Sequence, residues 1–149
     1  MMGLMPGDLH SVINEGEKPV AVGANCGVGA SDLLASILDI TAADPNAIVV
    51  AKANCGIPQI KGDAVEYTGT PELMHEYTKL ALNAGAKVIG GCCGTTGGHL
   101  AAMRQAMDEH QQTERPALDE IISTIGPLVN SVATEQTANE RPARRRRRA

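Results

Sequence analysis

Apolar and polar positions along the chain fall into two alternating patterns. Short runs of small and β-branched residues occupy 19–26, 47–55 and 87–93, and such runs are typical of strands buried in a parallel sheet. After each run, apolar residues recur at the spacing of an amphipathic helix. This order predicts an α/β fold in which helices cover a sheet of parallel strands.

The predicted helices carry start signals. Ser31 is expected to cap the first helix and Thr70 the second, in which Pro71 takes the first helical position. The inner face of the third helix is expected to consist of Leu100, Met103, Ala106 and Met107. The predicted helices cover 29–40, 69–86, a third segment that opens at Thr95 or Thr96, and a weaker segment at 118–125.

Charge divides the chain into two parts. The formal net charge is −4, but residues 1–140 contain seven basic and seventeen acidic residues, a net of −10. The chain ends in RPARRRRRA. We therefore expect one folded domain over 1–128 and a disordered, Arg-rich tail over 129–149. The acidic charge of the domain argues against nucleic-acid binding.

Neither a leader nor a membrane span is recognisable in the sequence. Residues 1–6 are too short for the apolar part of a signal peptide, and no apolar run approaches the roughly 18 residues of a spanning helix. The sequence thus predicts a cytoplasmic protein that does not bind membranes. In that reducing compartment, four cysteines indicate metal binding or catalysis rather than disulfides.

All four cysteines stand at the predicted carboxyl ends of strands, beside glycine. Cys26 ends the first strand, Cys55 the second, and Cys92 and Cys93 the third. The four-residue sequence Ala-Asn-Cys-Gly occurs twice, once with Cys26 and once with Cys55, and we call this short repeat the internal echo. Cysteine also packs well as a small hydrophobe. Since parallel strands bring their carboxyl ends to one edge, however, four thiols there favour a ligand site.

Zinc suits a cluster of thiolates, which it binds tetrahedrally at about 2.3 Å. Adjacent residues on a strand point to opposite faces, so Cys92 and Cys93 can share one ion only where the strand geometry ends. The glycines around them permit that change of backbone direction. Cys26 or Cys55 would supply a third ligand. Three ligands leave a position open for substrate and four close the site, and the spacing alone does not decide between them.

Two motifs resemble those of a known family. GANC at 23–26 and GGCCGT at 90–95 are similar to paired motifs of the homocysteine S-methyltransferase family. ANCGIP at 53–58 and EYTGTPELM at 66–74 are similar to the segments between them, and the resemblance runs from about residue 2 to residue 110. That family includes betaine–homocysteine methyltransferase and the homocysteine-binding part of cobalamin-dependent methionine synthase.

The resemblance implies a (β/α)8 (TIM) barrel with zinc at its C-terminal rim. By this resemblance Cys26, Cys92 and Cys93 are the metal ligands, homocysteine supplies a fourth sulfur, and no further catalytic residue is implied. The implied enzyme is a zinc-dependent S-methyltransferase of methionine biosynthesis. It transfers a methyl group from a small donor, such as betaine, S-methylmethionine or methyltetrahydrofolate, to the thiolate of homocysteine.

Three departures from the family pattern qualify this expectation. Cys55 stands where the family usually has alanine, and Gly97 replaces the usual proline after GTT. The chain also carries only three βα units, so we expect the C-terminal three units of a barrel that is incomplete in this chain. A second chain that completes the barrel would then be a partner. The alternatives are half of a split enzyme and a non-catalytic remnant that binds zinc or a partner.

Other polar residues have two interpretations each. Asn25 and Asn54 could orient a ligand or bind substrate, or could serve only as turn formers. His99 could support a metal ligand from behind, or could cap a helix or lie on the surface, and we expect one of the latter two roles. The glycine-rich segment GTTGGH at 94–99 could bind phosphate at a helix N-terminus, although the paired cysteines make this the weaker use.

Overall fold

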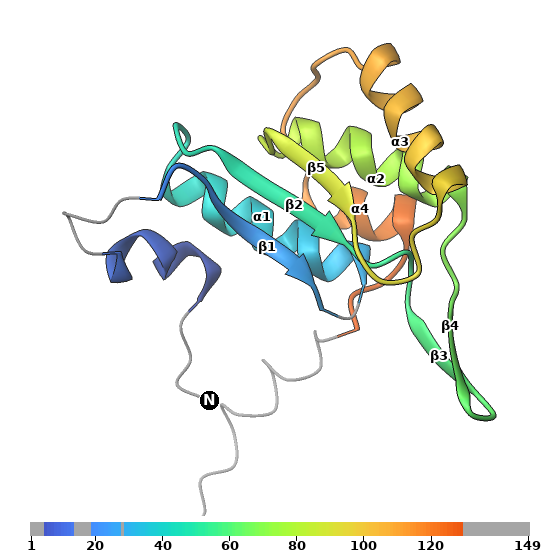
Figure 1. Cartoon of the computed structure of the whole chain (residues 1–149). Helices are drawn as coiled ribbons and strands as arrows, with labels where there is room; N and C mark the ends of the chain where they lie inside the picture. Colours follow the sequence, from blue (N-terminus) through green and yellow to red (C-terminus); the bar gives the residue numbers. More distant parts are fainter. Residues whose placement is uncertain (1–4, 14–18, 28, 130–149) are drawn as a thin grey trace, which may run out of the picture.

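A three-stranded parallel sheet forms the centre of the computed structural model, which describes residues 5–13, 19–27 and 29–129. Val22 pairs with Val49, and Val50 pairs with Val88, so the strands are aligned and end at one edge. The strands, in sheet order, are β1 (Val22–Cys26), β2 (Val49–Ala53) and β5 (Val88–Gly91). The predicted α/β fold with parallel strands is confirmed (Figure 1).

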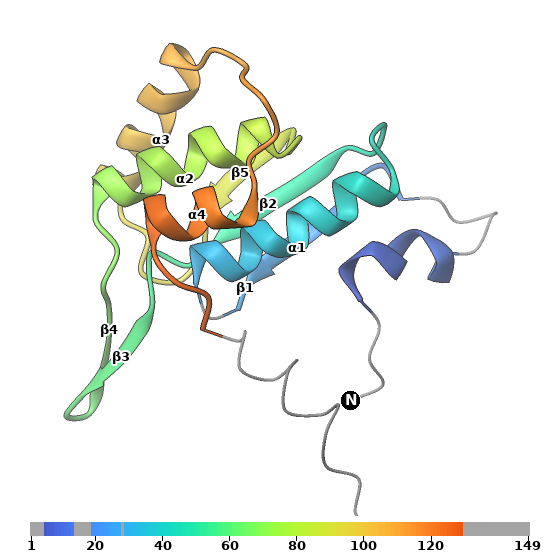
Figure 2. The same cartoon turned by 180° about the vertical axis from the view of Figure 1, so that it is seen from behind.

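Within the described residues, helices cover one face of this sheet, and none covers the other, open face. From behind, α1 (Ala30–Ala43), α2 (Pro71–Asn83) and α4 (Leu118–Ile125) lie over the strands, and α3 (Gly97–Glu109) lies beside α2 (Figure 2). A short 3-10 helix, η1 (Pro6–Val12), packs against α1. In the described part of the chain, no helix has the length and apolar character needed to cross a bilayer.

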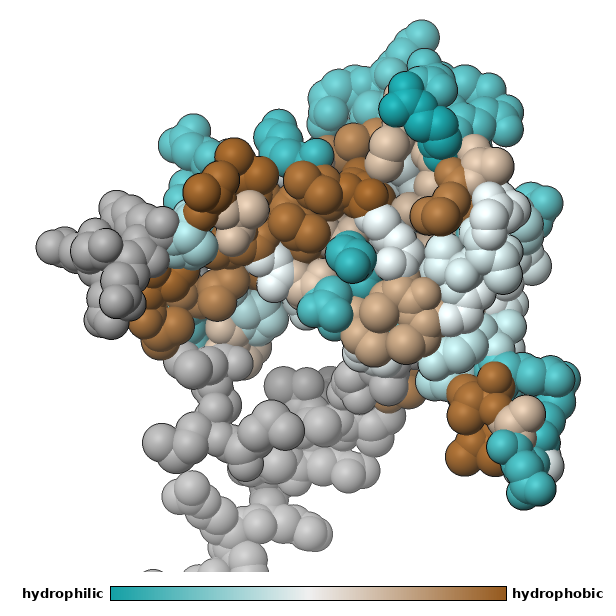
Figure 3. Space-filling view, viewed as in Figure 1, coloured by the Kyte–Doolittle hydropathy of each residue, from teal (hydrophilic) through white to brown (hydrophobic). Residues whose placement is uncertain are grey.

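The hydrophobic core lies between the sheet and the helices. On β2, Val49, Ala51 and Ala53 are fully buried against the helices, whereas Lys52 between them is exposed. The expected burial of the strands is therefore found on the face that packs against the helices, and in the described residues it does not extend to the other face. Apolar side chains remain visible on the open face (Figure 3), where Val88 keeps 49% of its surface exposed.

Two of the three predicted helix signals are found in the structure. Thr70 accepts a hydrogen bond from the backbone N–H of Leu73 at 3.3 Å, and Pro71 is the first residue of α2. The prediction that Ser31 caps α1 was wrong, because Gly29 holds the cap position. Ser31 lies within the first turn, where its hydroxyl donates to the carbonyl of Gly126 at 2.6 Å.

The inner face of α3 is narrower than predicted. Met103 and Ala106 are buried, and Met107 is half-buried. Leu100 is 51% exposed, so its assignment to the inner face was wrong. The helix packs mainly on α2, and one helical neighbour covers only a narrow stripe of its surface.

An antiparallel hairpin that the sequence interpretation missed lies between β2 and α2. It consists of β3 (Pro58–Lys61) and β4 (Ala64–Tyr67) and projects from the edge at which the parallel strands end (Figure 1). Its two-residue turn contains Gly62 with a φ of 62°. A Gly-Asp pair between two short extended runs is a recognised hairpin signal, so the sequence did contain the information.

Arg115 fastens the segment before α4 to the ends of two helices. Its guanidinium donates to the hydroxyl of Thr41 at 2.9 Å and to the backbone carbonyls of Leu38 and Ala84. These hydrogen bonds lie just before α4 in the chain. In α4 itself, Ile121 is fully buried in the core. The predicted Arg-rich tail lies outside the described residues except for Val129, whose N–H donates to Asp32 at 3.0 Å.

Replacing Arg115 with methionine should lower the free energy of unfolding by about 1–3 kcal/mol, because the carbonyls that it satisfies lose a charged donor. Arg104→Met is the matched control. Arg104 is 72% exposed, and its one ion pair with another described residue is with Asp108 one turn away, so its loss should cost less than about 0.5 kcal/mol. Urea denaturation of both variants measures the difference, and equal losses would contradict this account of Arg115.

Candidate metal centre

Three thiols meet at the carboxyl edge of the sheet. The Sγ atoms of Cys26 and Cys93 are 3.7 Å apart, and those of Cys92 and Cys93 are 3.9 Å apart. All three sulfurs lie within 4.8 Å of one another, and the described residues contain no other such group of three potential ligands. Zinc–sulfur bonds of about 2.3 Å place tetrahedral sulfurs roughly 3.8 Å apart, so the cluster fits a zinc ion.

The adjacent thiols share one side because the backbone turns directly after β5. The ladder continues to Cys92, whose N–H donates to Ala53 at 2.7 Å, and a turn then closes with the N–H of Thr95 donating to Cys92 at 3.2 Å. Gly94, within this turn, has a φ of 78°, which glycine adopts without strain. The predicted departure from strand geometry is confirmed.

Cys26 reaches the cluster from the end of β1 through an unusual backbone conformation. Its φ is 64°, and no other non-glycine residue in the described part of the chain has a positive φ. Such a conformation is costly for a residue with a side chain and persists only where surrounding contacts fix it. The residue with the strained backbone, Cys26, is thus itself a candidate metal ligand.

Asn54 connects the two loops that carry the thiols. Its Nδ2 donates to the carbonyl of Gly27 at 2.7 Å, and its Oδ1 accepts from the N–H of Cys93 at 3.2 Å. Asn54 is 2% exposed, whereas its counterpart in the echo, Asn25, is exposed on the open face. Asn54 therefore holds the main chain of Cys93, one of the candidate ligands, in position.

Cys55 does not join the cluster. Its thiol is 1% exposed and packs in the core, where burial raises its pKa. Its backbone N–H donates to the carbonyl of Cys93 at 2.9 Å, so it supports Cys93 through the main chain. The expectation that all four thiols gather at the edge was wrong, because the second strand ends at Ala53 and the chain then turns Cys55 inward.

The thiols influence one another electrostatically. Hydrogen bonding with Cys93, and then with Cys92, lowers the pKa of Cys26. Hydrogen bonding with Cys26 raises the pKa of Cys93, which is the most exposed of the three thiols. One thiolate within the group is thus stabilised by its neighbours, as expected where several sulfurs face the same space.

Tyr67 is a residue of this site that the sequence interpretation missed. It ends β4, and its ring lies against Gly94: a Cβ at Gly94 would come within 2.4 Å of the Tyr67 Cγ. Hydrogen bonding with Cys93 raises the pKa of Tyr67. The hairpin therefore brings an aromatic side chain to the thiol cluster, and recognising that hairpin would have been the way to find it.

His99 has the capping role predicted for it. Its Nδ1 accepts from the N–H of Thr96 at 3.0 Å and lies 2.8 Å from the Thr96 hydroxyl oxygen. Thr96 is the N-cap of α3 and forms a capping box with His99. The start of α3 is thus occupied by the chain's own side chains.

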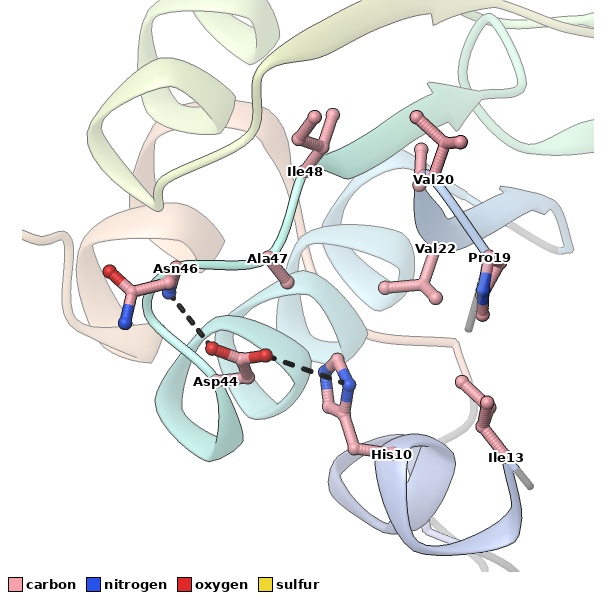
Figure 4. A pocket seen from close by; sticks show the side chains of 10 residues that line it. His10, Ile13, Pro19, Val20, Val22, Asp44, Asn46, Ala47 and Ile48 are labelled. Carbon is pink, nitrogen blue, oxygen red and sulfur yellow. Dashed lines mark hydrogen bonds and ion pairs between the residues drawn. The ribbon is translucent and has the colours of Figure 1, made fainter. Parts of the chain in front are cut away.

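A cavity of about 390 Å³ lies at the opposite edge of the sheet, next to the start of β1 and β2 (Figure 4). His10 and Asp44 face each other there, with 3.9 Å between the histidine Nδ1 and the carboxylate. The remaining walls are mostly apolar, with Val20 and Ile48 among them. The cavity contains no thiol and is separate from the candidate metal centre.

Comparison with known families agrees with the motifs described above. The family model described as homocysteine S-methyltransferase matches residues 1–107, which is more than half of the chain. The match includes all three clustered cysteines, the hairpin and Asn54.

Proposed function

The chain belongs to the homocysteine S-methyltransferase family, and we propose that it takes part in transferring a methyl group to the sulfur of homocysteine, with Cys26, Cys92 and Cys93 holding a zinc ion. The observation that carries this proposal is the spacing of the three sulfurs, at 3.7 and 3.9 Å along two sides of the group. Thiolates are the preferred protein ligands of zinc, and three of them leave one tetrahedral position for a further sulfur.

The chemistry of the reaction explains why such a site is useful. Homocysteine must lose its thiol proton to solvent before its sulfur can attack the methyl carbon. The bond from that carbon to the donor then breaks, and its electron pair stays with the donor. When bound, zinc stabilises a thiolate near neutral pH, as it does for other coordinated thiols.

The chain's own residues position the candidate ligands. Asn54 and Cys55 fix the main chain of Cys93 from two sides, through its N–H and its carbonyl. The strained backbone of Cys26 brings the first strand to the same point. Since these contacts are all made within the chain, they hold the donor set in place, and preorganisation of this kind limits the cost of binding.

We further propose that the sheet is part of a (β/α)8 barrel. Three features support this: neighbouring parallel strands, helices on one face only, and candidate ligands at the carboxyl ends (Figures 1 and 2). In such barrels, the strand face away from the helices lines the interior, and the active site lies at the carboxyl end. The exposed face that carries Asn25 and Lys52 would then be interior.

Zinc and thiol binding by the full chain test the proposal. After loading with zinc and removal of excess metal, elemental analysis should find one zinc per chain. Adding homocysteine should then release about one proton per chain, since a thiol binds zinc as its thiolate, while methionine, which has no thiol, should release none. Absence of retained zinc from protein with reduced cysteines would contradict the proposal. Methionine formation with each candidate donor would identify the methyl source.

A further inference from the structure

The open face of the sheet becomes polar near the thiols. Successive residues of a strand point to opposite faces, and the described strand residues on the open face are valine or glycine except at Asn25 and Lys52. These two residues are paired in the sheet register, one residue before β1 ends at Cys26 and β2 at Ala53. A hydrophilic area accordingly lies beside apolar residues on this face (Figure 3).

The side chain of Lys52 lies over the neighbouring strand β5. A Cβ placed on Gly90 would be 3.3 Å from the lysine Cγ and 3.6 Å from its Cε, so the aliphatic part of Lys52 passes over this glycine. The ladder continues from Gly90 to Cys92, and two residues of strand place both positions on the same face, about 6.6 Å apart. The ammonium group of Lys52 and the candidate ligand Cys92 are thus close enough for one small molecule to reach both.

Lys52 has no counter-charge in the described part of the chain. Its side chain is exposed, and none of the ion pairs found among the described residues includes it. In the barrel proposed above, this face lines the interior, where an unpaired ammonium group is costly. A bound anion removes that cost, and a carboxylate is the anionic group that an amino-acid substrate brings.

We propose that Lys52 binds the carboxylate of the thiol substrate and thereby makes the site selective for thiols that carry an acid group. The inference rests on the proposed function, since it places the substrate sulfur at the metal. Three carbon atoms separate the sulfur of homocysteine from its carboxylate carbon, a span similar to the separation of Gly90 and Cys92. An ammonium–carboxylate hydrogen bond is charge-assisted, and it strengthens where water is excluded. Lys52 thus determines which thiol binds.

Three thiols that differ in their charged groups test this assignment. Homocysteine carries an amine and a carboxylate, 4-mercaptobutyrate only the carboxylate, and 3-aminopropanethiol only the amine. Each would be titrated by calorimetry into the zinc-loaded full chain and into its Lys52→Met variant. The matched control is Lys87→Met, because Lys87 is also exposed but precedes β5, at the opposite end of that strand from the thiols. Zinc content would be measured on the same samples.

Lys52→Met should weaken the binding of homocysteine and of 4-mercaptobutyrate roughly tenfold, the order expected for loss of one hydrogen bond to a charged group, and should leave that of 3-aminopropanethiol within about twofold. Lys87→Met should match the unmodified protein with all three thiols. An equal loss for the three thiols, or no loss for homocysteine, would overturn this inference while the proposed function stands. Failure of the unmodified chain to retain zinc or to bind homocysteine would overturn the proposed function as well.

Discussion

Replacing Cys26 with serine should weaken zinc binding by more than about 100-fold, which is the largest effect that we expect from any single substitution. Serine keeps the size of the side chain but removes the thiolate, so two of the three sulfurs remain. Loss of a residue that merely supports a ligand typically costs 10–100-fold in metal affinity, and loss of a ligand should cost more. Competition with a chromophoric chelator measures the affinity.

The internal echo provides the control for this experiment. Cys55 follows the same Ala-Asn dipeptide as Cys26, but its thiol is buried in the core. Cys55→Ser should therefore leave zinc affinity within about threefold of the unmodified protein, at a modest cost in stability from burying a hydroxyl. Equal losses of affinity in both variants would show a four-cysteine site and would contradict the three-ligand proposal.

Replacing Asn54 with alanine should have the second largest effect. The variant removes the partner of the Gly27 carbonyl and of the Cys93 N–H; Asn54 itself is buried, whereas Gly27 and Cys93 are exposed. Loss of these two hydrogen bonds should lower the free energy of unfolding by about 1–3 kcal/mol. Zinc affinity should fall by roughly 10–100-fold, because Asn54 orients both of the loops that carry the clustered thiols, one at Gly27 and one at Cys93.

Asn25→Ala is the matched control for Asn54. Asn25 precedes Cys26 as Asn54 precedes Cys55, but its side chain is exposed on the open face. Its replacement should change stability by less than about 0.5 kcal/mol and should leave zinc affinity unaltered. Urea denaturation and chelator competition on both variants decide the matter. A similar effect of the two substitutions would mean that Asn54 has no particular role at the site.

Much of the candidate site could be predicted because strand ends are visible in the sequence. Three apolar runs, each followed by cysteine and glycine, indicated that thiols gather at one edge, and Cys26, Cys92 and Cys93 do meet there. Periodicity also located the helices that cover the sheet. These features depend on local sequence and on the general geometry of parallel strands, which do not require knowledge of tertiary contacts.

What could not be predicted depends on contacts between distant segments. The echo made Cys55 look equivalent to Cys26, and only the turn after β2 directs its thiol into the core. Ser31 resembles an N-cap, but its hydroxyl binds Gly126, which lies 95 residues further along the chain. The orienting role of Asn54 likewise depends on two loops that the sequence does not place beside it.

The hairpin was missed for a different reason. Its signal, Gly62 with Asp63 between two short extended runs, is local and could have been recognised. Its strands are four residues each and lack a continuous apolar face, so the hydrophobic pattern gave them little weight. The consequence is functional, because Tyr67 reaches the thiol cluster only through this hairpin.

X-ray absorption at the zinc edge tests the central proposal most directly, since it counts the sulfur ligands. The zinc-loaded chain should show three sulfur neighbours at about 2.3 Å together with one lighter atom. Adding homocysteine should replace the lighter atom with a fourth sulfur at a similar distance. Four sulfur neighbours before homocysteine is added, or fewer than three, would contradict a zinc site formed by Cys26, Cys92 and Cys93 with one position open for substrate.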